Sequence, residues 1–162
     1  MNYHNITMDD MLNGDGLRTV LWVSGCAHHC RGCQNPQTWD EHSGVPFDEK
    51  AKAELFSNLS KDYISGVTFS GGDPLCPSNQ ETVGSLIEEI HEKFPDKTIW
   101  LYTGDLFERI RTLPFIPLID VIVDGPYVEA LRDPQLYWKG SSNQRVINVK
   151  KTLESGKIVL WA

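Results

Sequence analysis

The sequence predicts an α/β protein with a parallel sheet, organised as a single domain over residues 1–162. Segments rich in β-branched and apolar residues alternate with segments of helical periodicity, which is typical of parallel strands connected by helices. A chain of 162 residues is long enough to bury one hydrophobic core. A loop with three cysteines follows the first expected strand, and glycine and acidic residues follow the next three. Because the carboxyl ends of parallel strands meet at one rim, these residues are expected to lie together where ligands bind.

The expected strands are short apolar segments that end at glycine or at a turn. They cover residues 18–24, 67–70, 98–102 and 120–123 and, toward the carboxyl end, 145–149 and 157–161. The expected helices cover residues 47–61, 80–94 and 105–111. The helix over residues 80–94 is predicted by apolar residues at helical spacing and by Pro95, which stops it.

Composition and charge limit the partners of the chain. The net charge of −7 argues against general nucleic-acid binding, because contacts to phosphate need clustered lysine and arginine. No apolar run is long enough for a transmembrane helix, so we expect no membrane partner. The amino-terminal residues are polar and acidic, unlike a signal peptide. Unpaired thiols indicate a reducing compartment, and we therefore expect a cytoplasmic protein.

Three cysteines, Cys26, Cys30 and Cys33, follow the first expected strand at C-x3-C-x2-C spacing. A cubane 4Fe–4S cluster normally takes four thiolates, one for each iron. Because no fourth cysteine lies nearby, three thiolates would leave one iron open to a ligand that is not protein. An open iron on a redox cluster is a catalytic position. The spacing is similar to that of the radical S-adenosylmethionine (SAM) enzymes, whose cluster binds SAM and splits it reductively.

Two other interpretations of the cysteines stay open. Three thiols with His28 or His29 could hold a structural zinc ion, although zinc sites usually combine two short pairs of ligands and no second pair exists here. A disulfide framework would need the distant Cys76, which otherwise fits an ordinary small residue after a turn. Taken singly, each histidine fits an exposed loop better than a ligand role. The spacing favours the open cluster.

The residues that follow the later strands form a second group of candidates. In Gly71-Gly72-Asp73-Pro74, the glycines would let a ligand approach the backbone and the Asp73 carboxylate could accept hydrogen bonds from an ammonium group. Such a run can also be a plain turn. Asp124 either lines the same rim or is a turn residue. Arg145 could contact a carboxylate or phosphate, but a solvated or salt-bridged arginine is the default interpretation.

Longer runs give the chain a family resemblance. The run N-G-D-G-L-R from Asn13 to Arg18, the run V-S-G-C-A-H-H-C-R-G-C-Q-N-P-Q-T-W and the run S-G-G-D-P resemble the activating enzymes of glycyl-radical proteins. The runs W-L-Y-T-G, V-I-V-D-G and W-K-G-S-S-N-Q-R narrow this resemblance to the activases of anaerobic (class III) ribonucleoside-triphosphate reductases. The likeness extends from Met1 to about Val149, with the motifs in the same order.

The resemblance implies a fold, a reaction and partners. The fold would be of the radical SAM type, an incomplete, laterally open parallel (β/α) barrel of about six strands, because the chain is too short for eight. The reaction would be reductive cleavage of SAM to a 5′-deoxyadenosyl radical. That radical would take a hydrogen from a glycine in the large catalytic subunit of the reductase. A one-electron reductant such as flavodoxin would be a second protein partner.

The resemblance also implies roles for residues. Cys26, Cys30 and Cys33 would bind three irons and SAM the fourth, which makes the cysteines both catalytic and metal-binding. The residues expected to contact SAM are Gly32, Cys33 and Gln34 on the adenine side, Gly71, Gly72 and Asp73 at the methionine amino end, and Thr103 and Asp124 at the ribose or a cation. Gly32 stands where many radical SAM enzymes have an aromatic residue, and Pro126 where some relatives have lysine. An aromatic stack from position 32 and a lysine contact from position 126 are therefore not expected.

Overall fold

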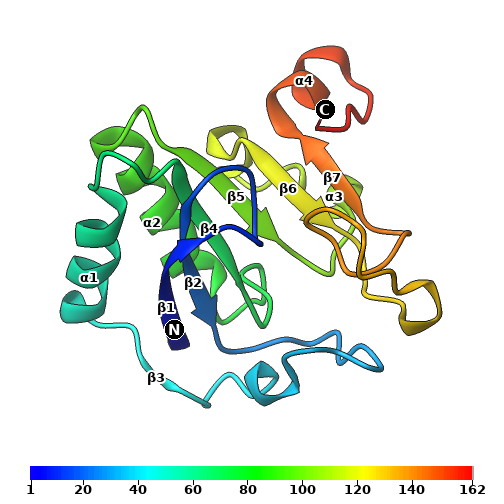
Figure 1. Cartoon of the computed structure of the whole chain (residues 1–162), viewed down its shortest axis with the longest axis horizontal. Helices are drawn as coiled ribbons and strands as arrows, with labels where there is room; N and C mark the ends of the chain where they lie inside the picture. Colours follow the sequence, from blue (N-terminus) through cyan, green and yellow to red (C-terminus); the bar gives the residue numbers. More distant parts are fainter. Residues whose placement is uncertain (162) are drawn as a thin grey trace.

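The computed structural model describes residues 1–161, and within them seven strands form one mixed sheet in the order β3-β1-β2-β4-β5-β6-β7 (Figure 1). The strands are β1 (Asn2–Asp10), β2 (Arg18–Val23), β3 (Val45–Pro46), β4 (Gly66–Gly71), β5 (Thr98–Tyr102), β6 (Val121–Asp124) and β7 (Arg145–Asn148). The α-helices are α1 (Glu49–Leu59), α2 (Gln80–Lys93), α3 (Phe107–Ile110) and α4 (Val149–Ser155). Short 3-10 helices are η1 (Pro36–Thr38), η2 (Ile116–Leu118) and η3 (Glu129–Leu131). The α/β class is confirmed.

The centre of the sheet is parallel and its edges are antiparallel. Strands β2, β4, β5 and β6 run parallel to one another. Strands β1 and β3 extend the sheet antiparallel at one edge, and β7 does so at the other. The expected barrel of about six parallel strands is therefore not confirmed. At the β7 edge the connection explains the difference: residues 125–144 contain only η3, and a parallel pair needs a crossover, usually a helix.

Strand β1 is not predicted by the sequence. Its residues are mostly polar and only Ile6 is buried, so no alternating hydrophobic pattern marks the segment as a strand. Register shifts interrupt its pairing with β2, one between Tyr3 and Asn5 and another between Thr7 and Asp10. Such irregularities are common near sheet edges. Backbone pairing to β2, rather than burial of its own side chains, holds this strand in place.

The carboxyl-terminal elements also differ from the expectation. The predicted strand at 145–149 ends at Asn148, whose side chain accepts a hydrogen bond from the Lys151 amide and begins α4. Gly156, at φ 73°, ends that helix in the left-handed conformation. The strand predicted at 157–161 is reduced to a single bridge between Ile147 and Leu160. The helix predicted at 105–111 spans only Phe107–Ile110.

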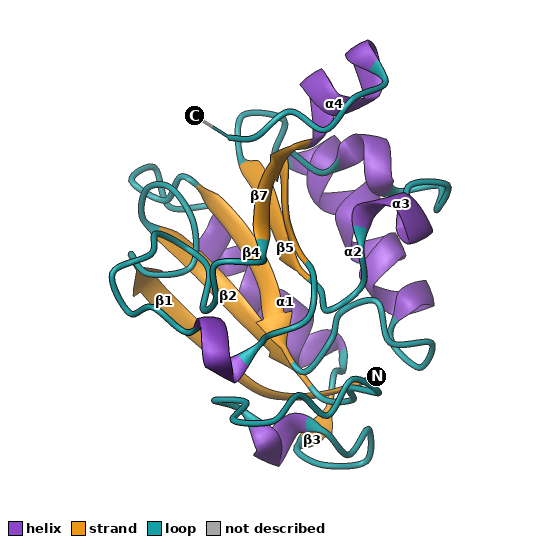
Figure 2. Cartoon of the chain, turned by 90° about the vertical axis from the view of Figure 1, so that its right-hand side faces the viewer, coloured by secondary structure: helices purple, strands orange, loops and turns teal. Residues whose placement is uncertain are grey.

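The two faces of the sheet are covered differently, because side chains alternate between them along each strand. On one face, Leu21, Phe69 and Leu101 form the main hydrophobic core. Leu55 of α1 and Ile87 of α2 pack into the same core. Figure 2 shows α2, α3 and α4 on one side of the sheet and long loops on the other. This second, loop-covered face is where the candidate site lies.

Buried aromatic and cationic side chains fill part of the loop-covered face. The ring of Trp100 packs edge-on against Trp138 and Trp161, with centroids 5.2 and 5.9 Å away. The fully buried Arg18 guanidinium lies 5.4 Å from the same ring, and burial lowers the pKa of Arg18 to about 10. Its hydrogen bonds to the Val67 and Thr98 carbonyls tie the amino ends of β2, β4 and β5 together. Among residues 1–161, no helix has the length and apolar character needed to cross a membrane.

Candidate functional site

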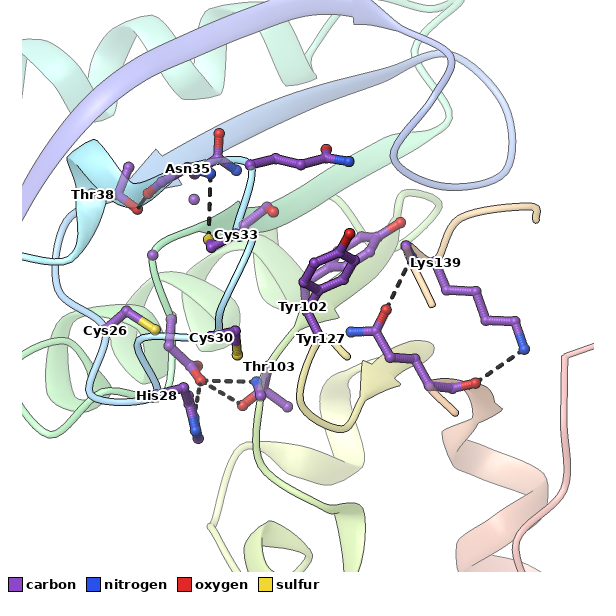
Figure 3. A pocket seen from close by; sticks show the side chains of 18 of the residues that line it. Cys26, His28, Cys30, Cys33, Asn35, Thr38, Tyr102, Thr103, Tyr127 and Lys139 are labelled. Carbon is purple, nitrogen blue, oxygen red and sulfur yellow. Dashed lines mark hydrogen bonds and ion pairs between the residues drawn. The ribbon is translucent and has the colours of Figure 1, made fainter. Parts of the chain in front are cut away.

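The three predicted cysteines line one cavity of about 430 Å³ at the carboxyl ends of the central strands (Figure 3). Cys26, Cys30 and Cys33 all come from the loop that follows β2. Each is a free thiol, and burial raises the pKa of the Cys26 thiol. Cys76 is also a free thiol, but it does not line the cavity. The cavity therefore gathers three thiols and no fourth cysteine.

Two backbone hydrogen bonds join the beginning of the cysteine loop to its end. The Gly25 amide donates a hydrogen bond to the Thr38 carbonyl at 2.6 Å, and the Cys26 amide donates to the Trp39 carbonyl at 3.1 Å. Both acceptors lie at the end of η1. Because the loop is closed by its own backbone, the positions of its thiols do not depend on a regular helix or strand.

Most, but not all, of the residues expected to contact SAM line this cavity. Those that line it with the cysteines are Gln34, Gly71, Gly72, Asp73 and Thr103. Gly32 and Asp124 are not among the lining residues. Gly32 has a φ of 77°, which few side chains adopt, and an added Cβ would lie 2.7 Å from the Glu129 side chain. Backbone conformation accounts for glycine at this position.

The two glycines after β4 let the cysteine loop approach closely. The Gly72 amide donates to the Val23 carbonyl at 2.8 Å, and the Asp73 amide donates to the Gly25 carbonyl at 2.7 Å. A Cβ on Gly72 would lie 2.5 Å from the Gly25 oxygen, and one on Gly71 would lie 2.5 Å from the Val23 nitrogen. The expectation from the sequence was that these glycines admit a ligand. The structure adds that they admit the neighbouring loop.

The Asp73 carboxylate is 2% exposed and already has four donors within the protein. One oxygen accepts from the Leu75 amide at 2.9 Å. The other accepts from the Thr103 hydroxyl at 3.0 Å, from the Gly104 amide at 2.9 Å and from His28 Nε2 at 2.8 Å. The side chains of both Asp73 and Thr103 are therefore used to join strand-end loops to one another. The sequence pattern predicted a carboxylate at this rim but not these partners.

Both histidines of the cysteine motif are engaged in contacts. The hydrogen bond to Asp73 raises the pKa of His28, whose ring packs so closely on Gly104 that a Cβ there would lie 2.5 Å away. The His29 ring stacks on Trp39, with centroids 4.5 Å apart and planes 11° from parallel. Sequence reasoning placed both in an exposed loop; His29 is exposed, whereas His28 is half-buried.

Asp124 lies on the helix-covered face, away from the cavity. Its carboxylate is fully buried and accepts from Arg145 Nε at 3.0 Å and from the Phe107 amide at 2.8 Å. Arg145 Nη2 also bonds Glu108 at 2.9 Å, and these two acids raise the pKa of Arg145. The default interpretation of Arg145 as a salt-bridged arginine is confirmed. The pair connects the ends of β6 and β7 to α3.

Several cavity residues come from segments for which the sequence predicted no role. They are Trp22, Tyr102, Tyr127, Trp138, Lys139 and Gln144. The Gln144 side chain accepts from the Gly140 amide at 2.9 Å and donates to the Gly125 carbonyl at 3.0 Å. Lys139 Nζ donates to the Gln144 carbonyl at 3.0 Å. The run W-K-G-S-S-N-Q-R was a signal for this loop, but without helical or strand periodicity it did not indicate a position beside the cysteines.

A loop of three free thiols, set at the carboxyl ends of parallel strands in an α/β fold, defines a candidate iron–sulfur protein. In agreement with this class, residues 12–147 match the family model described as "4Fe-4S single cluster domain".

Comparison with known proteins specifies the family. The chain is 47% identical over 146 residues to the anaerobic ribonucleoside-triphosphate reductase-activating protein of Enterobacteria phage T4, covering 90% of this chain and 93% of that protein. It is 40% identical over 154 residues to the protein of that name in Escherichia coli (93% and 100% covered). It is 38% identical over 154 residues to the one in Haemophilus influenzae (93% and 99% covered). The chain belongs to the family of anaerobic ribonucleoside-triphosphate reductase-activating proteins.

Proposed function

We propose that this protein activates an anaerobic ribonucleoside-triphosphate reductase by generating a glycyl radical on its large catalytic subunit. Cys26, Cys30 and Cys33 bind three irons of a 4Fe–4S cluster, and SAM occupies the fourth. A cluster held by these thiolates would supply one electron for reductive cleavage of the C5′–S bond of SAM. This cleavage would give methionine and a 5′-deoxyadenosyl radical, which would take the glycine Cα hydrogen.

The observation that carries this proposal is the set of three free thiols lining one cavity, with Cys76 outside its lining. Thiolates are the ligands that iron–sulfur clusters use, so the donor set fits the group. Cys26, Cys30 and Cys33 account for three irons, and no fourth cysteine lines the cavity. The fourth iron is therefore the position proposed for SAM.

The remaining cavity residues position SAM in this proposal. Gln34, Gly71 and Gly72 line the cavity. Gln34, together with Gly32 and Cys33, would contact the adenine side, and Gly71 and Gly72 would hold the methionine amino end. Asp73 and Thr103 position SAM indirectly in this proposal. Their side chains hydrogen-bond within the protein and hold the loops after β4 and β5 in place. Asp124 is given no contact to SAM here, because its carboxylate lies on the opposite face of the sheet and pairs with Arg145.

A protein substrate suits the open architecture. The mixed sheet has two free edges, at β3 and β7, and residues 1–162 work as one domain in this proposal. Residues 125–144 border the cavity without a covering helix, so a glycine-bearing segment of the reductase can enter from that side. Docking of the large subunit then excludes water and other C–H bonds from the reactive radical. A low-potential one-electron donor such as flavodoxin supplies the electron.

The test is anaerobic. The reconstituted protein, SAM, a low-potential reductant and the reductase subunit should together yield 5′-deoxyadenosine, methionine and an organic doublet on the subunit by paramagnetic resonance. Replacing the subunit's acceptor glycine with alanine should remove the doublet while the complex still forms. A doublet on the activating chain itself would refute the proposal.

The ligand set is tested separately. Alanine in place of Cys26, Cys30 or Cys33 should abolish SAM cleavage and lower the iron and sulfide content. Cys76→Ala is the matched control and should retain both. Equal loss of iron in Cys76→Ala would contradict the assignment of three ligands.

A further inference from the structure

Tyr102 stands out among the cavity residues by its place in the sheet. It is the last residue of β5 and pairs in register with Val123 of β6. Side chains alternate along a strand, so Tyr102 lies on the same face as Trp100 and opposite to the core residue Leu101. That face is the one that carries the cavity, and Tyr102 lines it (Figure 3). Its position is therefore set by a central strand rather than by a loop.

The Tyr102 hydroxyl is buried and, among the residues that the structure describes, has no hydrogen-bond partner. Only three buried side-chain atoms of residues 1–161 share this property, and a second, Trp39 Nε1, belongs to another residue of the same cavity. Neighbouring Trp22 differs, because its Nε1 donates to Thr7 Oγ1 at 3.1 Å. Buried polar groups in folded proteins are nearly always paired, and an unpaired one carries a desolvation penalty. Two such donors at one cavity indicate that a ligand completes them.

The protonation state of Tyr102 makes it a donor. Burial is the main cause that raises the pKa of this phenol, and the charge of Asp10 raises it further. The group therefore stays neutral at physiological pH and offers one O–H. A matching ligand atom is an oxygen or nitrogen acceptor. Such atoms are found on the ribose, adenine and carboxylate of SAM and on the backbone carbonyls of a glycine-bearing peptide segment.

We propose that Tyr102 is a ligand-binding residue whose hydroxyl donates a hydrogen bond to an acceptor atom of the molecule held in the cavity, either SAM or the reductase's glycine segment. This inference rests on the proposed function, because it takes the two occupants from it. It goes beyond that function by naming a contact that neither the cysteines nor the Gly71–Asp73 run supplies.

The first experiment compares Tyr102→Phe with the parent protein in the absence of SAM. The substitution removes only the hydroxyl and keeps the ring, so packing is unchanged. If the hydroxyl is unpaired, the melting temperature should stay the same or rise, because a buried polar atom without a partner is removed. Tyr63→Phe, at a 54% exposed tyrosine, is the matched control for the chemical change. A clear fall in the melting temperature of Tyr102→Phe alone would show an internal partner and overturn the inference.

The second experiment measures binding to the cluster-loaded protein under anaerobic conditions. SAM alone is titrated in one arm, and the reductase subunit is titrated onto the SAM-bound protein in the other. Loss of one neutral hydrogen bond should weaken binding by roughly two- to tenfold in one arm. A loss with SAM alone identifies SAM as the acceptor, and a loss only with the subunit identifies the glycine segment. Equal affinities of Tyr102→Phe and the parent in both arms would overturn the inference. If the parent itself binds no SAM, the proposed function fails instead.

Discussion

Replacing His28 with leucine removes one contact that joins the cysteine loop to the rest of the site. His28 Nε2 donates to the Asp73 carboxylate at 2.8 Å, and Asp73 in turn accepts from Thr103 and Gly104 on the loop after β5. Leucine keeps an apolar side chain of moderate size but has no donor. The substitution therefore removes the hydrogen bond and replaces the ring that packs on Gly104 with an aliphatic side chain.

The size of the effect follows from the donors that remain. After the substitution, Asp73 still accepts from the Leu75 and Gly104 amides and from the Thr103 hydroxyl, so its carboxylate is not left unpaired. The expected loss is that of one hydrogen bond to a charged group, about 1.5–3 kcal/mol. The His28 side chain is 26% exposed, which places the value near the lower end of this range. For a chain of this size, this corresponds to a fall in melting temperature of about 3–8 °C.

The assay is thermal unfolding of the apo protein, with His28→Gln as the matched variant. A glutamine side chain can place an amide N–H the same number of bonds from the backbone as histidine Nε2, so it should recover much of the loss. A second readout is the iron content after anaerobic reconstitution, which should fall in His28→Leu more than in His28→Gln. A leucine variant as stable as the parent, with full iron content, would refute the reasoning.

The pH dependence of the same difference gives a further check. The hydrogen bond to Asp73 is the largest cause that raises the pKa of His28, with Asp105 adding to it and burial and Arg109 opposing it. A raised pKa in the folded protein means that the contribution is fully present below the unfolded value of about 6.5. It is lost as the pH rises through the folded pKa. The stability gap between the parent and His28→Leu in the apo protein should therefore be larger at pH 6 than at pH 9, and a gap that widens with pH would contradict this contact.

Two other substitutions test the supports of the site. Gly72→Ala should destabilise the protein by roughly 1–3 kcal/mol and lower iron incorporation, because its Cβ would lie 2.5 Å from the Gly25 oxygen. Chemical unfolding measures the stability, and iron analysis measures the incorporation. A loss of SAM affinity alone would favour a glycine that faces only the ligand. Arg145→Met should cost about 3–5 kcal/mol in urea unfolding, since it leaves the fully buried Asp124 carboxylate without its cation. Asp124→Leu combined with Arg145→Met should recover part of that loss, and a double variant less stable than Arg145→Met would argue against the buried pair.

The parallel centre of the fold could be predicted because its strands and helices bury continuous apolar faces. Strands β2, β4, β5 and β6 and helices α1 and α2 lie where the sequence places them. The antiparallel edges could not, because their pairing depends on backbone contacts that leave little mark on hydrophobic periodicity. β1 buries only Ile6, and β7 turns back because no crossover helix follows β6. The expectation of about six parallel strands was too high, because only β2, β4, β5 and β6 belong to the alternating pattern of strands and helices.

The sequence predicted which loops lie together at the site. It did not predict the face of the sheet on which each side chain lies. The cysteines and the Gly71–Asp73 run lie at one cavity, as the strand ends indicated. Asp124 also ends a strand, yet it pairs with Arg145 on the far face. Side chains alternate between the two faces along β6, so Asp124 and the preceding Val123 lie on opposite faces. The sequence did not single out Tyr102, whose side chain lies on the face of the sheet that carries the cavity.

The hydrogen bonds between the strand-end loops can hold the three thiols in place for the proposed cluster with one open iron. A loop that supplies four cysteine ligands is held in place partly by its cluster. A loop that supplies three has one bond to the cluster fewer. Here the protein adds its own constraints: Asp73 binds the loop through its amide to Gly25 and through its carboxylate to His28. Asn79, the residue before α2, donates to the carbonyls of Ser24 and Asp73 and connects the same two segments. These contacts tie the cysteine loop to the loops after β4 and β5, so the protein itself can orient the three thiols.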